Sequence, residues 1–388
     1  MTAEFKLQSI ITRLNIGGPS RILRVLHEGL PRFGFQVRLA CGQVADGEEE
    51  ATTTAAFVTD RLPELGRRPA PRSDFRSLKT LEALLRRERP DIVHTHLAKA
   101  GLLGRLAAGR AGVPVTVHSF HGHTFDGYWS RSRSALLVRV ERYLARRTTA
   151  LVTHSEGQAS ELGRYLGRSA AGKISVIPPP IDLLPGAPTE DLRSSLDIGN
   201  QFVIAFVARL APVKDPESFL RIVKRLVERI PRGVVAIVAG GGTVAMEQRL
   251  HDLVDELGLR TQVRWLGFRP DPSAVYQAAD AVVMTSRNEG TPLVVLEAAA
   301  FEVPLVAYRV GGIADLASEG ISVRLVARGD EEGMANALVD LAGTRSVDLD
   351  RHLAARSEQV RPEHATELVV RRTAELYRRL AVSRAGRR

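Results

Sequence analysis

Both halves of this 388-residue chain alternate short runs of Val, Ile and Leu with longer segments of helical period. Such runs predict strands buried on both faces, with the intervening helices covering a parallel sheet. The predicted strands are residues 7–11, 37–41, 92–94, 115–118, 151–153 and 174–177, then 202–207, 234–238, 263–266, 281–284, 305–307 and 323–326. Helices are predicted between them, for example at 216–229, 245–257 and 293–301. The fold class is therefore α/β, with two doubly wound parallel-sheet domains facing across a cleft and ligands at the carboxyl ends of the strands.

A proline-rich break separates the two halves. Residues 178–189 hold five prolines in twelve positions and can continue neither a helix nor a central strand. We therefore predict an N-terminal domain at 1–182 and a C-terminal domain at 195–360, each long enough to bury its own core.

The net charge of +10 is unevenly distributed. Residues 1–180 carry +11, residues 181–360 carry −6 and residues 361–388 carry +5. A basic surface alone would suit a nucleic-acid binder, but aromatic residues make up only 5% and no recognition motif is present. No nucleic-acid partner is therefore expected.

The expected compartment follows from the cysteine count and the hydropathy pattern. Cys41 is the single cysteine, so an internal disulfide is excluded and a reducing compartment is favoured. Neither a signal peptide nor an uninterrupted apolar run of spanning length is visible. These features predict a cytoplasmic protein.

Two glycine pairs follow predicted strands. Gly17 and Gly18 lie in LNIGGPS, where a strand-to-helix turn would let a phosphate approach backbone N–H groups. A tight turn that needs glycine for steric reasons is the equal alternative. Gly311 and Gly312, in YRVGGIADL, are a second candidate backbone contact for phosphate.

Two cations follow the first strand of the second half. Arg209 comes just beyond the strand and Lys214 five residues later, a spacing that can direct both charges at one anion. Two solvated surface cations are the alternative.

The segment SRNEGTPLVVLEAAA carries the strongest signal. Pro292 suits the first turn of a helix, and the N–H groups nearby would form an anion site with Glu289 at its mouth. Glu297 lies more than a turn inside the same helix, amid Leu, Val and Ala. A buried carboxylate needs a partner, and a pair of ligand hydroxyls would serve.

These motifs occur in a recognisable order: GGP, HG in VHSFHGHTF, R-x4-K, E-x7-E within NEGTP, and VGG. In that order the chain resembles the glycosyltransferase family 4 enzymes, which are retaining transferases of GT-B fold with two Rossmann-like domains. The resemblance extends from residue 7 to about residue 325. It also implies that a final helix within 361–388 crosses back to the N-terminal domain.

The resemblance assigns roles to the motif residues. It implies that Arg209 and Lys214 neutralise the diphosphate of a nucleotide sugar, that Glu297 holds the ribose hydroxyls and that Glu289 lies beside the transferred sugar. Residues 265–269 match the place where the family binds the base. The implied nucleotide-sugar site comprises Gly17, Gly18, Arg209, Lys214, Phe268, Glu289, Gly290, Thr291, Pro292, Leu293 and Glu297.

A histidine of the first half is expected to face the sugar. His121, which begins the HG pair, is our choice as hydrogen bonder or local acid or base, with His118 and His123 as alternatives. The catalytic set is then Glu289, His121, Arg209 and Lys214.

No metal or cofactor is expected. The D-x-D sequence at 348–350 lies in a charged stretch away from every predicted strand end. Two cations and a helix N-terminus would stabilise the leaving diphosphate without a divalent ion.

The sequence departs from the family pattern at two places. Glu302, in AFEVP, stands where a glycine cap would be expected, which predicts a differently ended helix. Residues 240–243, GGGT, replace a commoner G-x-G form, a change with no expected effect.

The expected substrates are a nucleotide sugar, most simply a UDP-sugar, and a glycan or lipid-linked acceptor of envelope or exopolysaccharide synthesis. The segment 130–147 would place Leu136, Leu137, Val140 and Leu144 on one helical face with arginines elsewhere, so it could rest on an anionic membrane. This would make the protein peripheral on the inner face of the plasma membrane. A core helix with a solvated arginine face is the alternative.

Three other functions fit parts of the sequence. A non-hydrolysing sugar-nucleotide epimerase would use the same fold without an acceptor. A basic nucleic-acid binder is supported by charge alone. A catalytically silent sugar-binding relative is disfavoured because the charged motif set is complete.

Overall fold

The chain divides into two compact units in the computed structural model: residues 1–180 together with 365–388, and residues 181–364. The structure describes residues 5–15, 17–44, 50–122, 130–181, 190–318, 321–343 and 365–385. His123, the D-x-D sequence at 348–350 and most of the proline-rich break lie outside the described residues.

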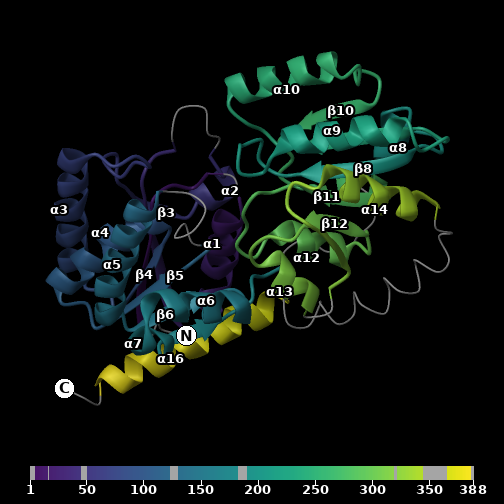
Figure 1. The fold of residues 1–388 in the computed structure, drawn as a ribbon. Helices are drawn as coiled ribbons and strands as arrows, with labels where there is room; N and C mark the ends of the chain where they lie inside the picture. The colour runs from purple at the N-terminus through teal and green to yellow at the C-terminus, as the bar shows by residue number, and fades with distance from the viewer. Residues whose placement is uncertain are drawn as a thin grey trace. The chain divides into compact units, whose positions relative to one another are not determined.

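The first unit is built on a seven-stranded sheet of order β3-β2-β1-β4-β5-β6-β7, with every pair parallel (Figure 1). Its strands are β1 Phe5–Ile11, β2 Phe35–Cys41, β3 Val58–Arg61, β4 Ile92–His96, β5 Val115–Ser119, β6 Ala150–Thr153 and β7 Ile174–Val176. Its helices are α1 Gly18–Gly29, the 3-10 helix η1 Leu30–Phe33, α2 Thr52–Ala55, α3 Pro71–Glu88, α4 Ala98–Ala111, α5 Arg131–Arg147, α6 Glu156–Leu166, α7 Arg168–Ala171 and α16 Thr366–Ala385.

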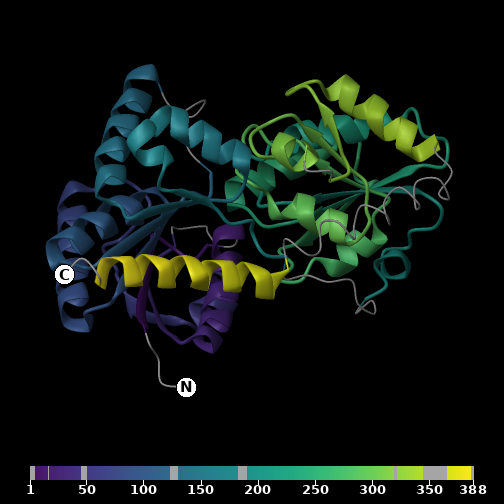
Figure 2. The same cartoon turned by 90° about the horizontal axis from the view of Figure 1, so that it is seen from below.

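Alternate strand residues face two separate cores because side chains in a strand point to opposite faces. Leu7 of β1 packs with α1 and α16, whereas Ile10 packs with α3 and α4. The last helix, α16 (yellow in Figure 2), places the fully buried Tyr377 in the first of these cores. Residues from the far end of the chain therefore complete the first unit.

The second unit contains a six-stranded parallel sheet of order β10-β9-β8-β11-β12-β13. Its strands are β8 Phe202–Val207, β9 Val234–Ala239, β10 Val263–Gly267, β11 Ala281–Met284, β12 Leu305–Tyr308 and β13 Val323–Val326. Its helices are α8 Leu192–Ser195, α9 Pro216–Val227, α10 Val244–Glu256, α11 Ser273–Ala278, α12 Leu293–Ala300, α13 Ile313–Ser318 and α14 Glu331–Gly343. Along β8, Ile204 faces α9 and α14 while Val203 faces α11 and α12, so both faces of the sheet are covered.

All twelve predicted strands are present, and the structure adds β3, which the sequence did not predict. The strand order reverses beside β1 in the first sheet and beside β8 in the second. In doubly wound sheets ligands bind at such switch points, outside the carboxyl ends of the strands. The loops that follow β1 and β4, and those that follow β8 and β11, are thus the places to look for a site.

Helix α5 buries part of its predicted apolar face and exposes the rest. Leu144 is buried and Leu137 packs against the core, but Leu136 is 61% exposed and lies beside exposed arginines. The residues of the predicted apolar face therefore divide between the core and solvent. Arg105 of α4, which is buried, donates two 2.8 Å hydrogen bonds to Glu141 and fixes which side of α5 faces the core.

Cys41 is buried and its thiol donates to the Gly42 carbonyl oxygen at 3.0 Å. Burial raises the pKa of this thiol to about 12, so the residue serves as a small core side chain. None of the described helices combines the length and apolar character needed to span a bilayer.

Candidate active site

The switch point of the second unit brings together two of the motifs predicted from sequence. The loop after β8 carries Arg209 and Lys214, and the loop after β11 carries Glu289. The Lys214 ammonium lies 2.5 Å from Oε1 of Glu289. The Glu289 side chain is 8% exposed and that of Lys214 is 23% exposed, so solvent has limited access to the pair. Charges in such a place interact more strongly than on an open surface.

The Glu289 loop packs closely against the two glycines that follow β12. A Cβ atom at Gly311 would lie 1.9 Å from the Glu289 carbonyl oxygen, and one at Gly312 would lie 2.2 Å from that of Gly290. Gly311 also has a φ of 48°, in the left-handed region. Close packing of two loops therefore accounts for both glycines, which the sequence predicted as a phosphate contact.

Helix α12 begins directly after this loop, with Pro292 at its N-cap and Leu293 as its first residue. The Thr291 hydroxyl is buried and has no hydrogen-bond partner among the described residues. Oriented N–H groups at a helix N-terminus attract anions, and an unpartnered hydroxyl can bond to a ligand oxygen.

Glu297 lies inside α12 and is 2% exposed. Oε2 of Glu297 accepts a hydrogen bond from the Tyr276 hydroxyl, and the Tyr276 ring stacks on Phe301 at 5.4 Å. Tyr276 was not predicted as a site residue, and it supplies a protein partner for the buried carboxylate.

Arg209 is half-buried beside the GGGT segment. The φ of Gly240 is 157°, and a Cβ atom there would lie 1.8 Å from the Ala208 carbonyl oxygen. Leu210 N donates to the Gly241 carbonyl oxygen at 2.8 Å. The glycines of this segment thus let the two loops at the carboxyl ends of β8 and β9 touch. Phe268, just beyond β10, is 37% exposed at the same edge of the sheet.

Glu302 ends α12 in the left-handed conformation, with a φ of 59°. The prediction that the missing glycine changes the helix end is therefore wrong. Glu302 adopts the left-handed conformation that a glycine would adopt here. The energetic cost is higher for Glu302 because it has a Cβ atom.

In the first unit, Gly17 is exposed and forms the N-cap of α1, whose first residue is Gly18. A Cβ atom at Gly17 would meet only Pro19, at 3.9 Å. Space is therefore open in front of the first turn of α1, as an anion contact requires.

His121 is the centre of a chain of three histidines at the carboxyl ends of β4, β5 and β6. His121 Nε2 lies 3.0 Å from Nδ1 of His96, and His121 Nδ1 lies 3.1 Å from Nε2 of His154. His154 Nδ1 lies 2.9 Å from the Ile177 carbonyl oxygen. His96 and His154 were not predicted as site residues. A signal was present, because His96 ends β4 and His154 directly follows β6.

The carbonyl of Ile177 assigns the tautomers of the neutral chain. A carbonyl can only accept, so His154 donates from Nδ1 and its Nε2 accepts from His121 Nδ1. His121 Nε2 then accepts from His96 Nδ1, which leaves His96 Nε2 as a buried acceptor without a partner among the described residues. Burial, with repulsion from neighbouring histidines, lowers the pKa of His121 and His96 well below 6.5. His121 and His96 are therefore neutral at physiological pH.

His118, an alternative to His121, contacts Thr95 through Nδ1 and is 2% exposed. A Cβ atom at Gly101 would lie 2.5 Å from its ring, so His118 is packed within the sheet and α4. His118 lies within β5 and His121 follows it, so His121 is the nearer of these two histidines to the carboxyl end of the strand.

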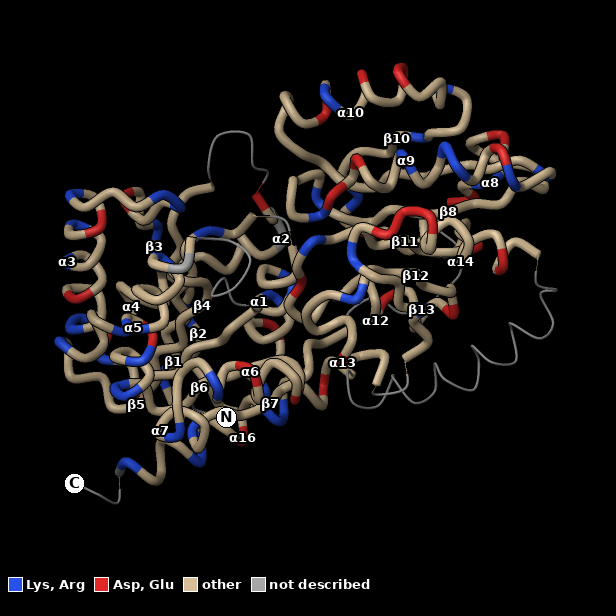
Figure 3. Tube along the Cα trace, viewed as in Figure 1, with Lys and Arg blue, Asp and Glu red and all other residues tan. Residues whose placement is uncertain are grey.

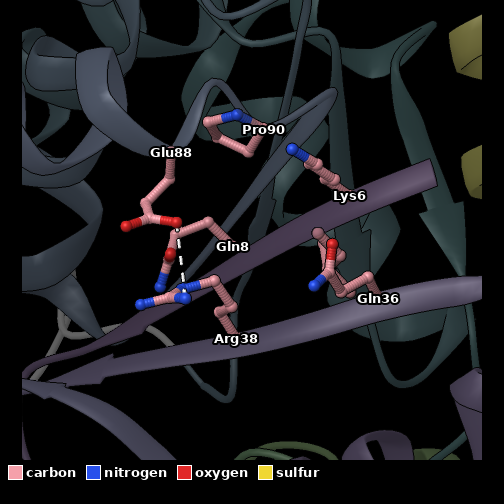
Figure 4. A pocket seen from close by; sticks show the side chains of 7 residues that line it. Lys6, Gln8, Gln36, Arg38, Glu88 and Pro90 are labelled. Atoms are coloured by element: carbon pink, nitrogen blue, oxygen red, sulfur yellow. Dashed lines mark ion pairs between the residues drawn. The ribbon is translucent and has the colours of Figure 1, made fainter. Parts of the chain in front are cut away.

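One small cavity lies at the opposite edge of the first sheet. It has a volume of about 60 Å³ and is lined by residues at the amino ends of β1 and β2, including Lys6, Gln8 and Arg38, together with Glu88 (Figure 4). Ligands bind at the other ends of the strands in such folds, so this cavity is separate from the candidate site.

Known families match both halves of the chain. Residues 16–183 match Glycosyltransferase Family 4, and residues 188–358 match Glycosyl transferases group 1. A UDP-Gal:alpha-D-GlcNAc-diphosphoundecaprenol alpha-1,3-galactosyltransferase of Escherichia coli is 32% identical over 346 residues, covering 86% of this chain and 87% of the relative. The chain belongs to glycosyltransferase family 4.

Further relatives agree with this family. A D-inositol 3-phosphate glycosyltransferase of Saccharomonospora viridis is 32% identical over 303 residues, covering 74% of this chain and 68% of the relative. Anabaena HepE in complex with UDP-glucose has a TM-score of 0.79 at 21% identity, covering 97% of this chain and 100% of that one. Sucrose-phosphate synthase of Thermosynechococcus elongatus has the same TM-score, identity and coverage. This family 4 enzyme is thus a glycosyltransferase of GT-B fold, as the sequence predicted.

Proposed function

We propose that this glycosyltransferase moves a sugar from a UDP-sugar to a lipid-linked or glycan acceptor with retention of anomeric configuration. The observation that carries the proposal is the Lys214–Glu289 pair at the switch point of the second unit, beside Arg209 and the start of α12. A UDP-sugar donor is supported by the name of the Escherichia coli relative and by the UDP-glucose complex of HepE.

Stabilising the leaving diphosphate is the main task in glycosyl transfer, because charge grows on it as the sugar becomes oxocarbenium-like. Lys214 and Arg209 supply positive charge, and the first N–H groups of α12 supply oriented dipoles. Glu289, which pairs with Lys214, would stand beside the sugar, and Glu297 would meet the ribose. We expect this set to act without a metal ion. Among the described residues no three His, Cys, Asp or Glu side chains converge to hold one.

We propose that His121 contacts a sugar hydroxyl of the substrate. Both of its ring nitrogens are engaged by histidines, so a contact with a sugar hydroxyl requires the exchange of one histidine partner for substrate. In the tautomer assigned above, Nε2 is an acceptor and can accept a hydrogen bond from a sugar hydroxyl once His96 turns away.

A lipid-linked acceptor would bring the enzyme to a membrane, and α5 offers a suitable surface. Leu136 and Tyr143 are exposed on this helix at 61% and 47%, and the Arg147 guanidinium lies 3.9 Å from the centre of the Tyr143 ring. Arg139 is exposed on the same stripe, and Figure 3 shows basic residues along α5. Basic residues near an anionic bilayer contribute about 1 kcal/mol each. We propose peripheral binding through this stripe.

The test is release of nucleotide from UDP, GDP and ADP sugars in EDTA, with and without a membrane extract as acceptor. We expect release from a UDP-sugar that increases with extract, and a product whose anomeric configuration matches the donor. Activity that appears only after a divalent ion is added would contradict metal independence. Conversion of the donor without any acceptor would indicate an epimerase instead.

A further inference from the structure

Hydrogen bonds of Asp215 and Arg287 connect the segment that carries Lys214 to the loop that carries Glu289, and neither residue was predicted as a site residue. The Arg287 guanidinium donates two hydrogen bonds to the Asp215 carboxylate, at 3.0 Å from Nε and 3.1 Å from Nη2. Arg287 N also donates to the Val213 carbonyl oxygen at 2.8 Å. Arg287 is therefore hydrogen-bonded to Val213 and Asp215, the two chain neighbours of Lys214.

A buried hydroxyl adds a further bond between the same segments. Thr285 is fully buried, and its hydroxyl lies 3.1 Å from the carbonyl oxygen of Lys214 and 2.8 Å from that of Asp215. A single hydroxyl proton is shared between the two acceptors. The backbone on either side of the Lys214 side chain is thus held by the loop of β11.

Asp215 is held in an uncommon conformation. It is buried, forms the N-cap of α9 and has a φ of 50° and a ψ of 54°. Residues with a Cβ atom adopt this left-handed region at an energetic cost, and they do so where surrounding contacts enforce it. The bidentate bond with Arg287 is such a contact, since Nε and Nη2 of the planar guanidinium bind both oxygens of the carboxylate and restrict its orientation.

We propose that Asp215 and Arg287 form a positioning clamp that holds the Lys214 ammonium at the diphosphate of the donor. This inference rests on the proposed function, in which Lys214 binds that diphosphate. The clamp joins the loops of β8 and β11, so it sets the Lys214–Glu289 spacing before substrate arrives. Arg287 and Asp215 act through Lys214 and are positioning residues.

The test uses the full-length enzyme with Asp215→Asn, Arg287→Gln and the double variant. Asparagine tolerates the left-handed conformation, so Asp215→Asn removes the charge and one acceptor without adding backbone strain. UDP affinity, kcat and KM for the donor, and hydrogen exchange of the amides at 213–219 are measured for each. The matched controls are Asp197→Asn, at another left-handed aspartate with a φ of 54°, and Arg324→Gln, which breaks the exposed Arg324–Asp340 pair.

We expect each single variant to weaken UDP binding and lower kcat/KM at least tenfold, because a displacement of about 1 Å can cost a hundredfold in rate. The double variant should lose no more than the worse single variant, since both remove the same clamp. Exchange at 213–219 should accelerate at least tenfold while the melting temperature stays within a few degrees. Arg287→Lys should restore part of the affinity, and both controls should behave as wild type.

Two results would overturn the clamp. If Asp215→Asn keeps or tightens UDP binding while Arg287→Gln weakens it, Arg287 contacts the phosphate directly. If exchange at 213–219 is unchanged in both variants, the pair does not hold the segment. If the wild-type enzyme binds no UDP, the proposed function fails, and the exchange measurement alone decides whether the clamp exists.

Discussion

The Lys214 ammonium and the Glu289 carboxylate form a 2.5 Å ion pair, although 75 residues separate them in the chain. Their loops follow β8 and β11, which are adjacent in the sheet. The pair therefore joins the cation proposed for the leaving diphosphate to the carboxylate proposed for the sugar.

Replacing Lys214 by alanine is expected to lower turnover at least a hundredfold, because one charge donor to the leaving group is lost; such losses are about 10² to 10³ in other enzymes. Steady-state release of UDP checks this. Near-wild-type turnover would remove Lys214 from the site.

Glu289→Gln is expected to preserve UDP affinity and to lower turnover, because glutamine keeps the shape of the side chain but not its charge. Calorimetric binding of UDP, set against turnover of the UDP-sugar, separates the two effects. Loss of UDP affinity with unchanged turnover of bound donor would contradict a role beside the sugar.

Tyr276→Phe is expected to destabilise the second unit by about 1–3 kcal/mol, because Oε2 of the buried Glu297 loses the hydrogen bond from the Tyr276 hydroxyl. Urea unfolding measures the loss. Tyr308→Phe is the matched control: this tyrosine is 1% exposed, and its hydroxyl has no partner among the described residues. Its removal should be neutral or slightly stabilising. Equal losses in the two variants would argue against a special role for the Tyr276 bond.

The first unit should lose stability in mild acid. Burial lowers the pKa of His27 to about 4 and, with repulsion from neighbouring charged groups, lowers those of His94, His96, His118 and His121 well below 6.5. Below pH 6.5 the unfolded chain binds protons that the folded unit does not, so stability is complete above that pH and falls as the pH decreases. Each histidine contributes up to about 1.4 kcal/mol per pH unit.

Calorimetric melting between about pH 7.5 and pH 5.5 measures this slope. The melting temperature of the first unit should fall as the pH falls. His27→Gln should make this dependence on pH weaker by the contribution of one histidine. A melting temperature that rises on acidification would contradict the lowered pKa values of these five histidines.

Glu302→Gly is expected to stabilise the second unit by about 1 kcal/mol, since glycine adopts a φ of 59° without the cost that a Cβ atom brings. Glu302→Ala is the control and should bring no such gain, because alanine retains the Cβ atom. Urea unfolding of the two variants decides the matter, and an equal gain in both would point to removal of charge instead.

Leu136→Glu combined with Arg139→Glu is expected to abolish flotation with anionic vesicles, since the exposed stripe of α5 loses an apolar contact and reverses a charge. Phe75→Glu with Lys79→Glu is the matched control on α3, where an exposed phenylalanine lies 4.7 Å from a lysine ammonium. Equal loss in both double variants would show that net charge alone governs binding.

The sequence by itself determined the twelve strands it predicted and the placement of the E-x7-E motif, because both depend on local patterns of apolar residues and on helix-start signals. It missed β3, a short edge strand with the sequence VTDR. The charged residues of β3 are satisfied by tertiary partners: Asp60 pairs with Arg38, and Arg61 pairs with Glu50. No local pattern of apolar residues predicts such a strand.

Only the tertiary structure decided which side chains meet. Parallel strands bring residues tens of positions apart to one edge, so strand order sets the contacts of His96, His121 and His154. The same order places Arg287 against Asp215, and the return of α16 places Tyr377 against His94 at 2.5 Å. Hydrogen bonds need donor and acceptor within about 3 Å, and a linear sequence does not contain those distances.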